Sequence, residues 1–191
     1  MYKMSVKSLA RVLRVCILVL LVVNILALVF IPTLVSLSYN TKTGQWLGLE
    51  EGVKFFWTEK DFFTSMFRSY GWVFKAPYTC ALSLFLWACG ICSAIMLWQA
   101  KWVVESVLRE DTLSFANAVS MKRAAYCCLG ISAAALIRAV WSLCYYHSAV
   151  PLVSYNTLFI PVFLVAGLLC MVFSALFRQA AEVKAENDLT I

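Results

Sequence analysis

Residues 15–35 read VCILVLLVVNILALVFIPTLV, and this stretch decides the class of fold. It contains no charged residue, and the next charge along the chain is Lys42. About 20 apolar residues form a helix long enough to cross the hydrocarbon layer of a bilayer. A cleaved signal peptide is the competing interpretation, but this apolar stretch is too long for one and no small-residue cleavage motif follows it. We therefore expect a first transmembrane helix, with Pro32 near its outer end, where a helix can terminate.

Three further stretches have the same character: residues 76–100, 124–146 and 151–177. The second of them contains one charge, Arg138, and only a short uncharged turn around His147 separates the last two. Overall 63% of the 191 residues are hydrophobic and 14% are charged, whereas soluble domains are about half apolar and about a quarter charged. The sequence predicts a single membrane domain over residues 1–191, an all-α bundle of four transmembrane helices.

The basic residues predict the orientation of these helices. Lys and Arg gather before residue 15, in the connection 101–123 and in the tail 178–191, with four, four and two bases respectively. The turn between the last two apolar stretches has none. Because basic segments stay on the cytoplasmic side, we expect both termini to be cytoplasmic. The net charge of +6 then reflects topology, and we expect no direct binding to nucleic acid.

The first loop, residues 36–75, is extracytoplasmic in this topology and is rich in aromatic residues. Thr58 and Asp61 mark a helix start, after which Phe62, Phe63 and Tyr70 would share one face. One interpretation is an interfacial helix that lies on the membrane and covers the bundle. The other is a surface that senses or binds a ligand.

Arg138 is the unusual residue of the third apolar stretch, because a charge near the bilayer centre costs about 3 kcal/mol on insertion scales. The structural interpretation is that the side chain extends outward to the interface or pairs with Glu50 or Glu51 of the first loop. The functional interpretation is an intramembrane site for an anion or a lipid headgroup.

No residue pattern indicates catalysis or a cofactor. The eight cysteines all lie in apolar stretches, where free thiols pack as small hydrophobic groups. Cys89 and Cys92 have the spacing of a metal or redox pair, but a metal site needs further ligands and the only histidine, His147, lies in another segment. The apolar stretches contain no Asp or Glu. We expect no enzyme activity, no metal and no cofactor.

Two pairs of small residues predict close contacts between helices. Gly90 with Ala94, and Gly130 with Ala134, have the spacing that lets helix backbones approach in lipid. They would bring the second and third helices together, or join protomers of a homo-oligomer.

Two cytoplasmic segments resemble a known family. The tail reads EVKAENDLTI over residues 182–191, and the connection contains Phe115, Asn117, Lys122 and Arg123. Both segments resemble the bacterial membrane family catalogued as domain of unknown function 2975 (DUF2975), with departures at Val183 and Ala185 in the tail.

The resemblance implies a partner, because members of this family are often encoded beside a very small helix-turn-helix DNA-binding protein. It suggests a membrane-embedded regulator or sensor that binds such a protein through its second connection and its tail. The docking residues would be Phe115, Asn117, Lys122, Arg123, Glu182, Glu186, Asn187, Asp188, Leu189, Thr190 and Ile191. The alternative is a small transporter or a lipid- or solute-binding subunit that uses Arg138 and the outer loop.

Overall fold

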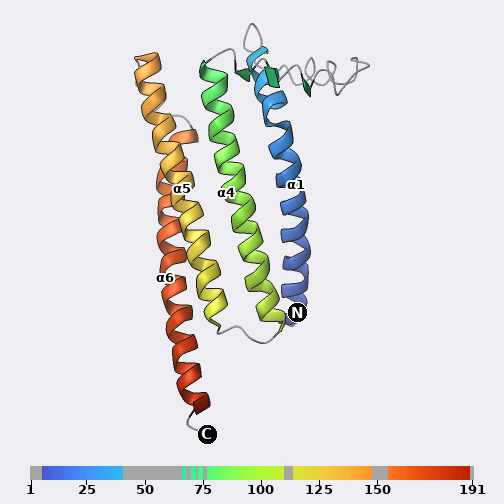
Figure 1. Cartoon of the computed structure of the whole chain (residues 1–191), viewed down its shortest axis with the longest axis vertical. Coiled ribbons are helices and arrows are strands. Elements are labelled where there is room, and N and C mark those ends of the chain that lie inside the picture. The colour runs from blue at the N-terminus through green and yellow to red at the C-terminus, as the bar shows by residue number, and fades with distance from the viewer. Residues whose placement is uncertain are drawn as a thin grey trace, which may run out of the picture. The chain divides into compact units, whose positions relative to one another are not determined.

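The described part of the chain is almost entirely helical. The computed structural model describes residues 6–40, 66–67, 70–71, 73–74, 77–109, 114–147 and 155–189. Its four long helices are α1 (Val6–Asn40), α4 (Pro77–Leu108), α5 (Phe115–Tyr146) and α6 (Tyr155–Leu189) (Figure 1). All four are long and apolar enough to cross a membrane. The predicted all-α, four-span architecture is confirmed at this level.

The helices are longer than the apolar stretches that predict them. α1 begins at Val6 and so includes the two arginines that precede the apolar stretch 15–35. At their other ends, α4 continues to Leu108 and α6 continues to Leu189. The added segments contain Lys, Arg, Glu, Gln and Ala, which are strong helix formers in water. A helix therefore continues after its apolar stretch has ended. The positions of the membrane boundaries along these helices, and the organisation as a single domain, stay predictions.

Pro32 does not terminate α1, which continues to Asn40. The helix end that a proline allows at this position is therefore not used. A proline removes one backbone donor, but a transmembrane helix tolerates this loss where its neighbours stabilise the surrounding turns. Pro32 is itself buried, and Ile31 and Val35 on either side of it belong to a buried cluster with Val73. Packing on both sides of the proline holds the helix together.

Contacts between residues divide the chain into two compact units, Leu26–Gly90 and a second unit made of Met1–Ile25 and Ile91–Ile191. The division passes through α1 and α4. In the Leu26–Gly90 unit, two side chains donate hydrogen bonds to carbonyl oxygens of α1. Trp87 Nε1 donates to the Leu28 oxygen over 3.1 Å, and the Tyr70 hydroxyl donates to the Val29 oxygen over 2.7 Å. Most of the predicted interfacial helix lies outside the described residues.

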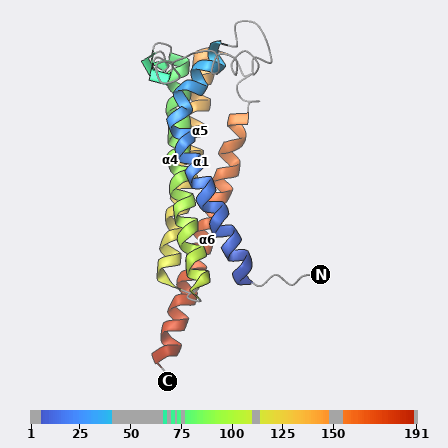
Figure 2. The same cartoon turned by 90° about the vertical axis from the view of Figure 1, so that its right-hand side faces the viewer.

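The other unit contains all of α5 and α6, which pack along one another (Figure 2). Two hydroxyls connect them: Ser132 of α5 donates to the Ile160 oxygen over 2.9 Å, and Ser174 of α6 donates to the Ala118 oxygen over 2.7 Å. Gly167 is buried where the backbones approach most closely, since a Cβ there would lie 3.3 Å from the Ala125 carbonyl oxygen. A larger residue would force the two helices apart.

In the same unit the start of α1 packs on the end of α4. Ala10 and Ile17 of α1 form a buried cluster with Val104 of α4. Beside it, Arg14 Nη2 lies 3.2 Å from Glu105 Oε1, and Lys101 Nζ lies 3.8 Å from the same oxygen. The basic segment before the first span is therefore held against the end of the second.

The predicted glycine contacts are correct for one position and wrong for the other. A Cβ on Gly130 would lie 3.6 Å from the Cys92 sulfur, so Gly130 of α5 faces α4 as expected. Gly90 instead faces Leu28 of α1. Because apolar residues surround every side of these helices, the spacing of small residues does not reveal which neighbour they face.

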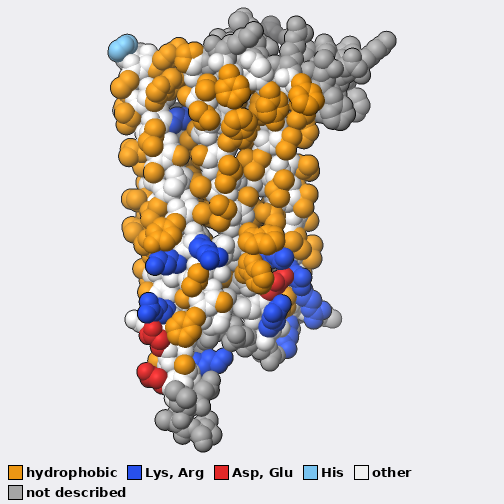
Figure 3. All heavy atoms as spheres, in the orientation of Figure 1, with side chains coloured by type: hydrophobic (Ala, Val, Ile, Leu, Met, Phe, Trp, Pro, Cys, Tyr) orange, Lys and Arg blue, Asp and Glu red, His pale blue; other side chains and the backbone are white. Residues whose placement is uncertain are grey.

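The outer surface of the helices is apolar. Large hydrophobic side chains stay exposed along every one of them, such as Ile137, which is 70% exposed. Figure 3 shows these side chains over the helices, with Lys and Arg collected toward the end at which α6 finishes. Water would disfavour so much apolar surface, whereas lipid accepts it. The fold therefore defines a multi-pass membrane protein.

Candidate docking surface at the α5–α6 end

The first turn of α5 forms one side of the candidate surface. Ser114 is extended, with φ −126° and ψ 148°, and its carbonyl oxygen accepts from the N–H groups of Asn117 and Ala118. The described structure gives Ser114 no side-chain capping bond, although it occupies the N-cap position. The helix therefore begins at Phe115. Phe115, Lys122 and Arg123 are all exposed, which is what docking would require of them.

Asn117 has a different position, because its side chain is only 2% exposed. Its Nδ2 donates to Ser106 Oγ over 2.6 Å, and the Ser106 hydroxyl donates to the Val103 oxygen over 2.8 Å. These two bonds hold the first turn of α5 against the last turns of α4. Asn117 therefore positions the connection instead of presenting a group to a partner.

The end of α6 forms the other side. In both views α6 continues past the end of α4 and the start of α5 (Figures 1 and 2). Ala181 is the last buried residue of the described part, and every described side chain from residue 182 to residue 187 is exposed. Arg178 Nε donates to Glu182 Oε1 over 3.0 Å, one helical turn away. Val183 is 57% exposed among charged neighbours.

The rest of the predicted tail site is only partly described. Glu186 and Asn187 are exposed on α6. Asp188 and Leu189 are the last residues of the helix, while Thr190 and Ile191 lie outside the described residues. The acids of the tail thus follow the same helix that contacts α5 through Ser174.

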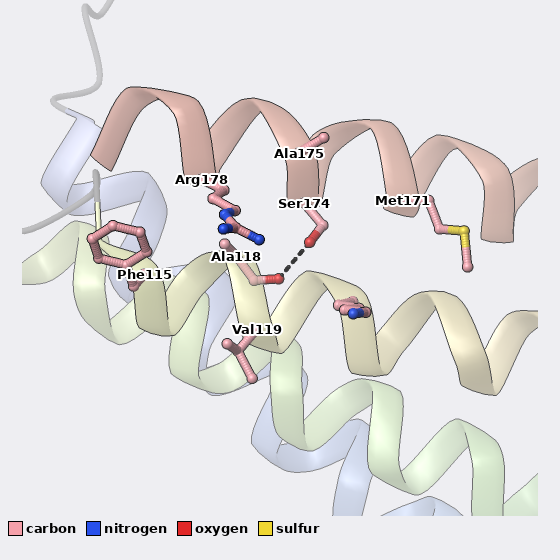
Figure 4. Close-up of a pocket in the computed structure, with 8 residues that line it drawn as sticks. Phe115, Ala118, Val119, Met171, Ser174, Ala175 and Arg178 are labelled. Atoms are coloured by element: carbon pink, nitrogen blue, oxygen red, sulfur yellow. Dashed lines mark hydrogen bonds between the residues drawn. The ribbon is translucent and has the colours of Figure 1, made fainter. Parts of the chain in front are cut away.

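A groove connects the two sides. It has a volume of about 480 Å³ and lies between the start of α5 and the facing turns of α6 (Figure 4). Arg178 and Ser174 point from α6 toward α5 in this view. Eight residues line the groove: Phe115, Ala118, Val119, Lys122, Met171, Ser174, Ala175 and Arg178. The sequence predicts Phe115 and Lys122 as docking residues. Arg178 is one of the two bases of the tail, and from the sequence these bases predict only the orientation of the helices.

A second groove, of about 560 Å³, lies between the end of α4 and the start of α5. Arg109 and Arg123 line it together with Trp98 and Trp102, which are types of residue that favour the membrane interface. Asn117 also borders it. The structure therefore places Phe115, Asn117 and Arg123 around one groove and Phe115 and Lys122 around the other, with Phe115 shared between them.

Arg138 lies elsewhere, in the second half of α5, and it lines neither groove. Its side chain is half-buried and has a partner within the structure. The predicted partners Glu50 and Glu51 lie outside the described residues. The choice between an outward-reaching arginine and an intramembrane anion site therefore stays open.

The described helices contain every cysteine of the chain. All eight cysteines are free thiols, and Cys128 Sγ lies 3.8 Å from the Met96 sulfur, which joins α5 to α4. Among the residues that the structure describes, no three His, Cys, Asp or Glu side chains gather in a way that would hold a metal ion.

Ser174 and Arg178 are the polar groove residues that the sequence did not single out, and Gly167 belongs to the helix contact beside the groove. Ser174 and Arg178 are four residues apart and so share a helix face. Gly167 lies seven residues before Ser174, close to the same face. That spacing was the available signal, but a single glycine and serine in an apolar helix are too common to mark a contact.

The fold and this end of the molecule define a four-span membrane protein with an exposed charged helix end. The chain belongs to the family described as Protein of unknown function (DUF2975), which matches residues 60–191. This match confirms the resemblance seen in the sequence. No curated protein and no solved structure matches the chain.

Proposed function

We propose that this chain is a membrane-embedded regulator that binds a small cytoplasmic helix-turn-helix protein at the end formed by the start of α5 and the last turns of α6. The observation that carries the proposal is the exposed end of α6. A helix whose last turns are exposed, as the described side chains of residues 182–187 are, is normally marginal in water. Here it extends from a firmly packed helix, which keeps it formed and available to a partner.

The charges of this helix end favour a basic partner. Glu182, Glu186 and Asp188 occupy the last two turns, and the last turn contains no basic residue. Acids near a helix C-terminus are unfavourable, because the helix dipole is negative there. DNA-binding proteins have basic surfaces. A basic partner would offset both the negative side-chain charge and the negative end of the helix dipole. A partner that used its DNA-binding surface for this contact could no longer bind DNA phosphates with it.

An apolar contact would add to the electrostatic one. Val183 is exposed beside these acids, and Phe115 is exposed at the start of α5. Exposed apolar side chains within a charged surface are typical anchors for a partner protein. Asn117 supports this surface from below by holding the α4–α5 connection in place.

The proposal includes a topology in which both termini and the α4–α5 connection are cytoplasmic in the inner membrane of a bacterium. Arg14, Glu105, Asn117 and Arg178 support it, because their contacts gather these three segments at one end of a single compact unit. Basic residues predominate there, as the positive-inside rule requires of cytoplasmic segments.

The test is affinity purification of the tagged full chain in mild detergent, compared with a chain that ends at Ala181. Ala181 is buried, so the shorter chain keeps the packed part of α6. We expect a small helix-turn-helix protein to co-purify with the full chain and not with the shorter one. A charge reversal at Glu186 should weaken this capture, while Arg11→Glu, on the exposed part of α1, should not. Equal recovery with both chains would refute tail docking.

A further inference from the structure

We propose that the groove between α5 and α6 binds an anionic phospholipid, with Arg178 and Lys122 along its headgroup and the apolar lining along an acyl chain. This ligand goes beyond the proposed docking of a regulator: the groove shares Phe115 and Lys122 with the candidate docking surface, whereas no residue beyond Ala181 lines it. It is also separate from Arg138, because that residue does not line the groove.

The position of the two cations along their helices corresponds to the headgroup level. α6 contains no charge from Tyr155 to Phe177, and Arg178 is the first charged residue after that stretch. A hydrocarbon layer of about 30 Å corresponds to about 20 helical residues, so Arg178 lies where the headgroups begin. On α5, Lys122 and Arg123 are the last charges before an uncharged stretch that continues to Arg138. Because Ala118 meets Ser174, Lys122 lies on the other side of that contact from Arg178, deeper along the groove.

The groove has the two chemistries that a phospholipid needs. Lys122 and Arg178 provide positive charge, while Val119, Met171 and Ala175 provide an apolar wall. Basic pockets between transmembrane helices are where anionic lipid headgroups bind. A volume of about 480 Å³ lies within the usual range for small-ligand sites, and a headgroup with the first part of a chain fits that size.

The guanidinium of Arg178 has a partner one turn along α6, although its side chain is 71% exposed. Its Nε is bonded to Glu182, and a guanidinium has four further N–H donors for a phosphate. In Figure 4 the side chain points from α6 toward the turn of α5 that contains Ala118. The Ser174 hydrogen bond to Ala118 holds the two helices together below it. Orientation before binding lowers the entropy lost on binding.

An anionic lipid fits the surroundings better than a soluble anion or an acidic peptide. The outward side of α6 is covered by exposed apolar residues, among them Leu168, Val172 and Leu176. A lipid chain leaving the groove would continue along such a surface without meeting water. A soluble phosphate would use the two cations and leave the apolar wall unoccupied.

The test is native mass spectrometry of the full chain, released from detergent after titration with phosphatidylglycerol. Parallel titrations use phosphatidylcholine with the same acyl chains, and glycerol 3-phosphate without chains. We expect phosphatidylglycerol to bind at least tenfold more tightly than either. Equal binding of phosphatidylcholine would mean that the apolar surface alone is recognised, and competition by glycerol 3-phosphate at similar concentration would assign the site to a soluble anion. Either result overturns the proposal.

Variants locate the site. Each basic charge near a headgroup contributes about fivefold in affinity, so Lys122→Gln with Arg178→Gln should weaken phosphatidylglycerol binding by about 25-fold. Arg11→Gln removes one charge from an exposed position on α1 and should change it less than twofold. Ala175→Trp fills the groove while both cations stay, and should also abolish tight binding. Unchanged phosphatidylglycerol binding in the double variant or in Ala175→Trp would refute this location. The two variants are independent tests, so if one of them folds poorly the other decides.

Discussion

Ser174 of α6 donates a 2.7 Å hydrogen bond to the carbonyl oxygen of Ala118 in α5, and this bond places the end of one helix beside the start of the other. The consequence is that two segments far apart in the sequence, the α4–α5 connection and the tail, meet at one end of the molecule. Hydrogen bonds between transmembrane helices contribute about 0.6–2 kcal/mol each. The candidate surface therefore depends on the helix contact beneath it.

The α5–α6 contact predicts opposite effects for two glycines. Gly167→Ala should lower the free energy of unfolding by about 1 kcal/mol, because its Cβ would press on Leu129 and the Ala125 carbonyl. Gly130→Ala should leave it unchanged or raise it by up to about 1 kcal/mol, because its Cβ meets Cys92 at an ordinary distance and alanine favours helix. Thermal unfolding in detergent compares the two. No loss for Gly167→Ala would show that the close approach at Gly167 is absent.

The buried amide of Asn117 predicts an energetic coupling to Ser106. Asn117→Ala should cost about 1 kcal/mol, because the substitution removes the hydrogen bond from the buried amide to the part-buried Ser106 hydroxyl. A double-mutant cycle with Ser106→Ala should give a coupling energy of at least about 0.5 kcal/mol. Chemical unfolding of the four proteins measures it. Additive losses would mean that the two side chains act independently.

Removal of the tail predicts little change in stability. A chain that ends at Ala181 loses only residues whose described side chains are exposed, so its free energy of unfolding should stay within about 0.5 kcal/mol of the full chain. A matched truncation at Leu176 also removes Arg178 and the buried Ala181, and should destabilise the protein. If both truncations are equally harmful, the tail has a structural role that the docking proposal lacks.

The proposed topology predicts the behaviour of reporter fusions. Green fluorescent protein at the carboxyl end should be fluorescent and alkaline phosphatase there inactive, because the tail is cytoplasmic in our proposal. Alkaline phosphatase fused after His147 should be active, since that turn would lie outside the cell. The reverse pattern would place the acidic tail outside, and a cytoplasmic regulator could not reach it.

The sequence predicts the four helices well and their neighbours poorly. Uncharged stretches such as residues 15–35 identify crossings, because a bilayer excludes charge along a fixed length. They do not show where helices end, and Pro32 lies inside α1 as a result. They also do not show which face meets which helix. In water an apolar stripe marks the buried face, whereas lipid leaves apolar residues on every face.

The candidate site shows the same division. Family resemblance in the tail and connection directs attention to the end of the molecule at which Phe115 and Lys122 share a groove. The burial of Asn117 could not be predicted, because it depends on how α5 is rotated against α4. The sequence does not reveal the position of Arg178 in the groove for a related reason. A basic residue after an apolar stretch is first explained by membrane topology, and only the packing of α6 against α5 places Arg178 beside a groove.

The most direct test of the central claim is photo-crosslinking in living cells with a benzophenone amino acid at Val183. That side chain is exposed on the tail beside the acids that would attract a basic partner. Our account predicts one crosslinked adduct with a small helix-turn-helix protein, and none from the same probe at Leu136, an exposed position near the middle of α5. A probe at Val183 that captures no protein, or the same proteins as Leu136, would contradict it.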